Sequence, residues 1–348
     1  MTAVNPPAGH PAPHARGSIP MRSIGGVAVT EIGLGCMNLS HGYGLPPSPE
    51  EGTALIRRAL ELGITHFDTA ALYGFGKNET LVGAALAPVR HQVHLASKCG
   101  FSVSDSGYTV DGRPESLRKT CFESLQRLGT DVIDLYYLHR WDKRFPIEES
   151  VGVLRNLLTQ GHIRAIGLSE VSAATLRRAH AVHPIAAVQN EYSIWTRNPE
   201  IALIDECDRL GVTLVAFSPL TRGYLLGAVG DPSELVAKDF RRDLPRFSEP
   251  HFSANLPRIK AFHNLAADAA CTPAQLALAW ILQRAPRAVV IPGTRSIPHL
   301  EDNTGAARIR LSAETIAQLE ALFPAGDSHG PRYGTKAQAQ VDTEQFAS

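Results

Sequence analysis

Four side chains that can exchange a proton stand at the ends of short apolar segments or just beyond them. Asp68, Lys98 and His139 each close a different segment, and Tyr73 lies five residues after Asp68. A free tyrosine is a poor acid at neutral pH because its pKa is about 10, but a nearby ammonium group lowers that pKa. Lys98 could supply this charge while Asp68 holds Lys98 in place, and His139 could donate a hydrogen bond to a substrate oxygen. The set predicts proton transfer at oxygen during a reaction at a carbonyl carbon.

The apolar segments that precede these residues must bring them together. Eight such segments alternate with amphipathic helical patterns, at residues 30–35, 66–69, 93–97, 132–138, 163–168, 187–189, 213–217 and 289–291. They are short and apolar without clean alternation, which is typical of parallel strands buried on both faces. Eight βα units predict an α/β fold, a closed (β/α)8 TIM barrel, whose active site lies at the carboxyl ends of the strands.

Turn and spacing signals predict two additions to this barrel. Gly25 and Gly26 separate two short segments and predict an N-terminal β-hairpin that could close the bottom of the barrel. The 72 positions from Phe217 to Val289 are far more than one helix needs. We therefore expect a long loop after strand 7, at about residues 220–255, on the catalytic face.

Composition excludes several classes of protein. The chain has 348 residues, 44% of them hydrophobic, with 34 basic and 34 acidic side chains and a formal net charge of zero. The apolar content excludes intrinsic disorder, and the balanced charge argues against nucleic-acid binding through the overall field. The longest apolar run in the C-terminal half, residues 276–282, is far shorter than the roughly 20 residues of a membrane span. Five cysteines without CxxC spacing, and no signal-peptide pattern, favour a cytoplasmic location.

Seven segments of the sequence resemble the aldo-keto reductase family, in the family's order. GITHFDTAALYG at residues 63–74 resembles the family signature, LASKCG at 95–100 the lysine segment and DLYYLHR at 134–140 the histidine segment. The cofactor segments are resembled by AIGLSE at 165–170, VQNEYS at 188–193, AFSPL at 216–220 and IPGTRS at 291–296. The likeness runs from about residue 21 to 323 and is greatest to the bacterial and plant branch that includes perakine reductase-like enzymes.

The resemblance implies NADPH-dependent reduction of an aldehyde or ketone to an alcohol. Hydride would pass from carbon 4 of the nicotinamide to the carbonyl carbon, and no metal would take part. Tyr73 would give the proton as general acid, tuned by Lys98 and Asp68, while His139 orients the carbonyl. The expected partner is a small carbonyl compound, and the sequence does not name it or the oligomeric state.

The resemblance also implies a set of cofactor-binding residues. Ser169 and Gln189 match positions that bind the nicotinamide carboxamide, and Phe217 matches a tyrosine that stacks on the nicotinamide ring. Arg295, just before a helix N-terminus, suits the 2′-phosphate and favours NADPH over NADH. The full set is Gly35, Met37, Asp68, Ser169, Gln189, Phe217, Ser218, Pro219, Leu220, Arg222, Gly293, Thr294, Arg295, His299, Asp302 and Asn303.

Three positions depart from the family pattern. Glu170 stands where many members have asparagine, Thr221 replaces a usual glycine, and His299 replaces an arginine or glutamine. The substrate pocket is expected to be aromatic and mostly apolar, built from loops after the strands. Its predicted residues are Met37, Tyr43, Tyr73 and Trp141, together with the loop at residues 220–255.

The order of the motifs indicates one domain, because residues spread over 227 positions, from Asp68 to Arg295, would have to meet at one mouth. We expect a flexible proline-rich extension at residues 1–18, a single NADP-dependent oxidoreductase barrel at 19–330 and a polar C-terminal tail at 331–348.

Two other functions remain open at this point. A cofactor-binding sensor or regulatory subunit on the same fold, such as a potassium-channel β subunit, would keep all four catalytic residues. A Schiff-base aldolase would use Lys98 as its nucleophile, but this hypothesis does not explain Phe217 or Arg295.

Overall fold

Eight parallel strands form the centre of the molecule in the computed structural model, which describes residues 19–40, 42–104 and 107–346. The extension expected at residues 1–18 lies outside the described part. Along the sheet the strand order is β12-β11-β10-β9-β8-β5-β4-β3. The strands are β3 Leu34–Gly35, β4 His66–Asp68, β5 His94–Cys99, β8 Leu135–Leu138, β9 Ile166–Ser169, β10 Ala187–Glu191, β11 Thr213–Phe217 and β12 Val289–Val290.

The first and last strands of this sheet meet, which confirms the predicted (β/α)8 barrel. Parallel bridges join Ile32 to Val290 and Gly35 to Gly293. The closure explains Gly35 in steric terms, because a Cβ there would lie 2.7 Å from the backbone oxygen of Ile291. All eight predicted strands are present, although several are shorter than the apolar segments that predicted them.

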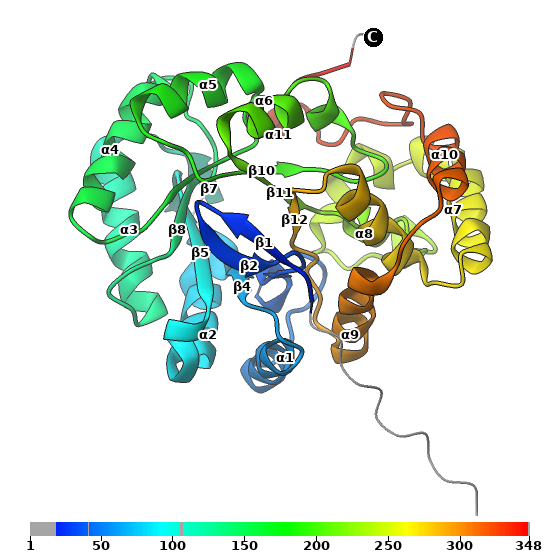
Figure 1. The fold of residues 1–348 in the computed structure, drawn as a ribbon, viewed down its shortest axis with the longest axis horizontal. Helices are drawn as coiled ribbons and strands as arrows, with labels where there is room; N and C mark the ends of the chain where they lie inside the picture. Colours follow the sequence, from blue (N-terminus) through cyan, green and yellow to red (C-terminus); the bar gives the residue numbers. More distant parts are fainter. Residues whose placement is uncertain (1–18, 41, 105–106, 347–348) are drawn as a thin grey trace, which may run out of the picture.

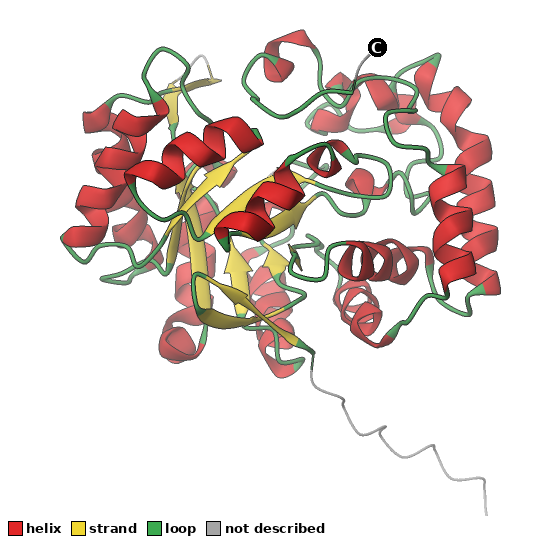
Figure 2. Ribbon diagram, turned by 45° about the horizontal axis from the view of Figure 1, so that its top comes forward, coloured by secondary structure: helices red, strands yellow, loops and turns green. Residues whose placement is uncertain are grey.

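Helices surround the barrel on the outside (Figures 1 and 2). Two of them begin with complete capping boxes, Ser48 with Glu51 and Thr272 with Gln275, and each has proline in its first turn. Within the described residues no single helix is long and apolar enough to cross a membrane; only α7 and α8 reach that threshold, as a pair bent by 83°. The helices are α1 Pro49–Glu61, α2 Lys77–Leu86, α3 Pro114–Leu128, α4 Ile147–Thr159, α5 Ala173–Val182, α6 Leu203–Leu210, α7 His251–Asp268, α8 Pro273–Arg284, α9 Ile297–Gly305, α10 Ala313–Leu322 and α11 Thr335–Gln338.

The predicted N-terminal hairpin closes the bottom of the barrel. Strands β1 (Met21–Ile24) and β2 (Val27–Thr30) pair antiparallel around Gly25 and Gly26, which both have positive φ. Ile24 and Val29 belong to the same buried cluster as side chains from β5, β8, β10, β11 and β12. The hairpin thus completes the core of the barrel at the end opposite the strand carboxyl termini (Figure 1).

Two long connections lie at the carboxyl ends of the strands. After β11 the chain runs through short 3-10 turns until α7 begins at His251, which confirms the expected long loop. After β5 it forms a second antiparallel hairpin, β6 (Phe101–Ser104) with β7 (Gly107–Val110), which the sequence analysis did not predict. Both connections supply aromatic side chains to the mouth of the barrel.

The C-terminal residues are tied to the barrel as far as the structure describes them. Asp342 accepts hydrogen bonds from the hydroxyls of Ser172 and Thr175, at 3.1 and 2.6 Å, at the start of α5. Glu344 accepts from the backbone N–H of Ala173 at 2.7 Å. Carboxylates at a helix N-terminus are stabilising, so these bonds hold Asp342 and Glu344 at the start of α5.

Candidate active site

Lys98 contacts two of the three other predicted catalytic residues. Its Nζ atom lies 2.5 Å from Asp68 Oδ1 and donates to the Tyr73 hydroxyl at 3.2 Å and to the Thr69 carbonyl at 2.8 Å. Asp68 pairs in register with Ala96, and Lys98 lies two residues further along β5, so its side chain is on the same face as Ala96. The side chains of Lys98 and Asp68 are 0% and 2% exposed, so this ion pair is shielded from water.

His139 joins this group from the next strand. It follows β8, and its backbone N–H donates to the Cys99 carbonyl at 2.8 Å. Its ring meets the Tyr73 ring edge to face, with centroids 5.8 Å apart. Phe101 packs in the same manner on the imidazole, at 5.1 Å. The structure therefore brings Asp68, Tyr73, Lys98 and His139 together, and adds Phe101 from the hairpin that the sequence analysis missed.

Burial dominates the electrostatics of this cluster. It raises the pKa of Tyr73, and Lys98 opposes that rise without reversing it, whereas the sequence pattern predicted a lowered pKa. Burial likewise raises the pKa of Asp68, against the effect of Lys98 and of a hydrogen bond from Gln189. Burial would lower the pKa of Lys98, but Asp68 and Tyr73 outweigh burial, so that pKa rises. Tyr73 is thus a neutral phenol beside a charged ammonium group, which can stabilise a phenolate when the proton leaves.

The residues matched to the nicotinamide carboxamide lie on adjacent strands at the same mouth. Ser169 ends β9 and pairs in register with Gln189 of β10, and both side chains are buried. Gln189 Nε2 donates to Asp68 Oδ2 at 2.7 Å, and Ser169 Oγ accepts from Arg140 at 3.3 Å. Phe217, the last residue of β11, is half-buried and packs against the inner core of the barrel.

A cavity of about 200 Å³ gathers six of the residues matched to the cofactor, namely Leu220, Gly293, Thr294, His299, Asp302 and Asn303. Its lining includes the first residues of α8 and, from α9, His299, Asp302 and Asn303. Ser296 caps α9 by accepting from the backbone N–H of His299, and Asp302 accepts from the Thr272 hydroxyl at 2.9 Å. Free N–H groups at a helix N-terminus favour an anionic ligand such as a phosphate.

Three other residues matched to the cofactor, Ser218, Pro219 and Arg295, do not line this cavity but are next to lining residues in the sequence. Arg295 is exposed and donates from Nη1 to the carbonyl of Leu45, in the connection after β3. Pro219 is buried, and Ser218 has a φ of 49°. Thr221 has a φ of 48°, in the left-handed region that glycine adopts most easily, and glycine is the residue that the family usually has there.

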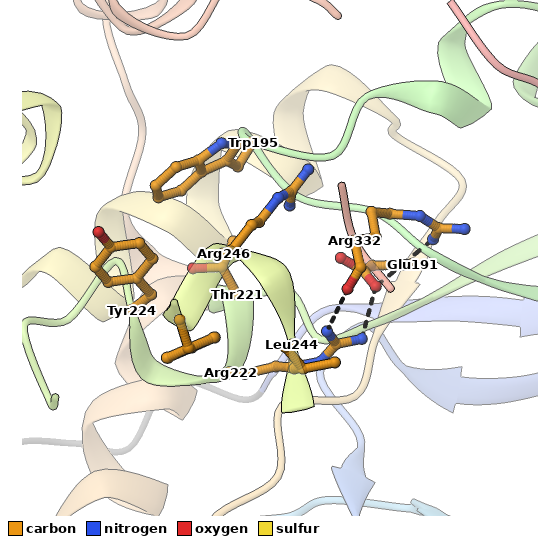
Figure 3. A pocket seen from close by; sticks show the side chains of 9 residues that line it. Glu191, Trp195, Thr221, Arg222, Tyr224, Leu244, Arg246 and Arg332 are labelled. Atoms are coloured by element: carbon orange, nitrogen blue, oxygen red, sulfur yellow. Dashed lines mark hydrogen bonds and ion pairs between the residues drawn. The ribbon is translucent and has the colours of Figure 1, made fainter. Parts of the chain in front are cut away.

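Arg222 does not line the cavity of about 200 Å³ but a second, much smaller one, which Figure 3 shows. Arg222 was expected in the loop that faces the pyrophosphate. Its side chain instead points to Glu191, with Nη2 2.9 Å from Oε2. Arg332 approaches the same carboxylate at 3.5 Å, and these three residues border a cavity of about 10 Å³, enough for about one water molecule. The structure therefore gives Arg222 a role in holding the loop after β11 against β10.

The unusual Glu170 has a partner that the sequence analysis did not find. Its carboxylate accepts from Arg332 Nη2 at 2.8 Å, and the Glu170 and Arg332 side chains are 0% and 6% exposed. Glu170 has a φ of 54°, a region that asparagine tolerates better than glutamate. Its side chain is therefore bound to the C-terminal segment, and no sequence pattern indicated a partner 162 positions away.

The residues expected to form the substrate pocket lie in connections after the strands, where several of them contact other aromatic side chains. Tyr43 packs on Phe240 with ring centroids 5.1 Å apart, and Gly42 fits between Met37 and Phe240. Trp141 donates from its indole nitrogen to the Phe145 carbonyl at 2.8 Å. Phe240 and Tyr333 were not predicted as site residues; Tyr333 packs under Arg222 at 4.9 Å, and burial raises its pKa. Tyr333 lies in the segment expected to be a polar tail, so it gave no sequence signal.

Comparison with known proteins agrees with this geometry. The family model described as "Aldo/keto reductase family" matches residues 31–323. The chain is 39% identical over 331 residues to the aldo-keto reductase yakc [NADP(+)] of Schizosaccharomyces pombe, covering 93% of this chain and 97% of that protein.

Solved structures show the same fold. The glycerol dehydrogenase AKR11B4 from Gluconobacter oxydans superposes with a TM-score of 0.79 at 27% identity, covering 90% of this chain and 99% of that one. An aldo-keto reductase from Klebsiella pneumoniae in complex with NADPH gives a TM-score of 0.69 at 27% identity, covering 90% and 98%. The chain belongs to the aldo/keto reductase family.

Proposed function

We propose that the protein reduces an aldehyde or ketone to an alcohol with NADPH, using Tyr73 as the general acid. The observation that carries this proposal is that the Nζ atom of Lys98 contacts both Asp68 and Tyr73 at the carboxyl ends of β4 and β5. A buried ammonium 3.2 Å from a phenol hydroxyl is suited to stabilising the phenolate that remains after proton transfer.

In this mechanism the proton that the carbonyl oxygen receives comes from a side chain of the protein. NADPH, when bound at the mouth, would supply the hydride for the carbonyl carbon. The Tyr73 O–H bond would break as its proton passes to the carbonyl oxygen. Lys98 then faces a phenolate, while its ion pair with Asp68 holds Nζ in place. His139, whose ring lies 5.8 Å from that of Tyr73, is positioned to donate a hydrogen bond to the same oxygen.

The residues around the mouth fit NADPH. The cavity of about 200 Å³ between Leu220 and the starts of α8 and α9 is lined by backbone and small side chains at Gly293 and Thr294. The capped start of α9 favours a phosphate, and Arg295 lies directly before the capping residue. The fission-yeast relative is named for NADP(+), and the Klebsiella structure holds NADPH.

The aldolase hypothesis fits the site less well. A Schiff-base lysine must be neutral to attack a carbonyl. Lys98 is instead fully buried in an ion pair with Asp68, and its pKa is raised. Aromatic rings in the connections after the strands, Tyr43 on Phe240 and Phe101 on His139, favour carbonyl compounds with an apolar or aromatic body.

The direct test is NADPH consumption with a panel of aldehydes, ketones and quinones. We expect the absorbance of NADPH to fall with at least one aromatic carbonyl compound, and an alcohol to form in equal amount. Tight NADPH binding without oxidation by any member of the panel would instead favour the sensor hypothesis. Reaction of Lys98 with a carbonyl, trapped by borohydride, would favour the aldolase.

A further inference from the structure

A small cavity next to the end of β10 and the loop after β11 is lined mainly by positive charge (Figure 3). Its volume is about 10 Å³, enough for about one water molecule or one ion of similar size. Three of the four charged side chains that line it are arginines. They are Arg222, Arg246 and Arg332, and the fourth charged residue is Glu191.

The carboxylates of this cluster do not balance its arginines. Glu191 pairs with Arg222 at 2.9 Å and lies 3.5 Å from Arg332, which pairs in turn with Glu170 at 2.8 Å. These four side chains are at most 7% exposed. Two carboxylates therefore neutralise two guanidinium groups, and the charge of Arg246 is left over. A charge that is removed from water needs a partner of opposite sign.

Arg246 donates hydrogen bonds only to neutral oxygens within the described part of the chain. Its Nε donates to the Gly330 carbonyl at 3.1 Å. Nη1 and Nη2 donate to the hydroxyls of Thr196 and Ser328, at 3.0 and 3.1 Å. A guanidinium group has five N–H bonds, so two of them have no acceptor among the described residues. Burial and the two other arginines lower the pKa of Arg246 to about 10, which still leaves it charged at neutral pH.

A second hydrogen-bond donor at the same cavity also lacks an acceptor. Trp195 lines the cavity and is 6% exposed, and its indole Nε1 has no hydrogen-bond partner in the residues that the structure describes. The guanidinium carbon of Arg246 lies 5.7 Å from the centre of the Trp195 ring, and Figure 3 shows the two side chains next to each other. A buried donor without an acceptor costs free energy. The unused donors and the uncompensated charge favour the same ligand, a small anion.

We propose that this cavity binds one chloride ion or similar halide, held by Arg246 and Trp195. A halide accepts hydrogen bonds without donating any, supplies the missing negative charge and is of a size that the volume admits. Glu191 repels it little, because Arg222 and Arg332 neutralise that carboxylate. A water molecule would accept the same bonds but leave the charge of Arg246 uncompensated. The site goes beyond the proposed function, and neither its residues nor its test depends on the reaction.

The test follows urea denaturation while sodium chloride replaces sodium gluconate at constant ionic strength, since gluconate is too large for the cavity. An anion that binds only the folded chain stabilises it by mass action. Well above the Kd, the unfolding equilibrium constant should therefore fall about tenfold for each tenfold rise in chloride concentration. Arg246→Gln should remove this dependence, and Trp195→Phe should weaken it.

Trp280→Phe is the matched control. Trp280 is also buried, and its Nε1 also has no partner in the described part of the chain, but it does not line this cavity. This variant should keep the wild-type dependence on chloride, and so should Arg295→Ala, which removes the exposed cation beside the start of α9.

Two results in solution would overturn the proposal. One is a wild-type stability that does not respond to chloride, and the other is an equal response in the wild type, Arg246→Gln and Trp195→Phe. Crystals of the wild-type chain grown with sodium bromide decide the matter even where a variant does not fold. We expect an anomalous bromide peak in the cavity, within hydrogen-bonding reach of Arg246 and Trp195. A water molecule there, and no bromide, would also overturn the proposal.

Discussion

At the scale of single residues, the site depends on charges that are buried but paired. Lys98 has Asp68 at 2.5 Å and Tyr73 at 3.2 Å, so its ammonium group is held at the point where a phenolate would form. An electrostatic group that is already oriented costs no reorganisation during the reaction. In the proposed mechanism, this preorganisation would allow a tyrosine whose pKa is raised by burial to give its proton to a carbonyl oxygen.

Arg295 gives a residue-scale prediction about the cofactor. It is exposed beside the start of α9, where its guanidinium can reach a 2′-phosphate that NADH lacks. Arg295→Ala should raise the Kd for NADPH roughly 10- to 100-fold, the value of one or two charge-assisted hydrogen bonds. Titration of NADPH and NADH by fluorescence measures this, with Arg57→Ala, an exposed arginine of α1, as the control. Equal weakening of both cofactors would refute the assignment.

At the scale of elements, the barrel positions the site because neighbouring strands end together. That β4, β5 and β8 bring Asp68, Lys98 and His139 to one end of the barrel could be anticipated, since each of these polar residues closes an apolar segment. The hairpin β6–β7 could not be predicted from the sequence, because its strands are short and partly exposed. Only the folded structure shows that Phe101 packs on His139. The sequence placed Arg222 in the loop after β11, but the direction of its side chain depends on its ion pair with Glu191 of β10.

A buried histidine pair between β4 and β5 gives an element-scale prediction. His66 and His94 lie with their Nδ1 atoms 2.9 Å apart. Burial lowers the pKa of His66 to about 4 and that of His94 to about 3. Between about pH 6.5 and pH 4 the unfolded chain therefore binds more protons than the folded one, so the free energy of unfolding falls as pH falls.

If both histidines take up a proton on unfolding, the free energy of unfolding should change by up to about 2.7 kcal/mol per pH unit. Urea denaturation at several pH values from neutral to about pH 5 measures it. The double variant His66→Gln, His94→Gln should flatten the slope, whereas His91→Gln, at an exposed position, should leave it unchanged. A wild-type slope in the double variant would show that these two histidines are not its source.

At the scale of the whole molecule, the first and last segments that the structure describes both pack on the barrel. The N-terminal hairpin closes the bottom, and the C-terminal segment returns to the mouth and to α5 (Figure 1). The sequence indicated the hairpin, because a Gly-Gly turn is a local signal. It did not indicate the second closure, because Arg332 and Glu170 meet only through the folded structure, 162 positions apart.

The buried contact of Glu170 with Arg332 predicts that one substitution there should strongly lower the free energy of unfolding. Glu170→Gln leaves Arg332 buried with only the more distant Glu191 as a charged partner, so the free energy of unfolding should fall by roughly 3–5 kcal/mol. The double variant Glu170→Gln, Arg332→Met should recover part of that loss. Chemical denaturation measures both, with Glu301→Gln, in an exposed pair with Arg58, as the control at under about 1 kcal/mol. A Glu170→Gln loss no larger than the control would contradict the account.

The most direct test of the central claim is single-turnover oxidation of NADPH by Tyr73→Phe with a carbonyl substrate that the wild type reduces. Phenylalanine keeps the ring that packs against His139 and removes only the hydroxyl that Lys98 contacts. The account predicts a rate lower by about 10²- to 10⁴-fold, the usual contribution of a general acid, with a nearly unchanged Kd for NADPH. A wild-type rate in Tyr73→Phe would show that another group gives the proton.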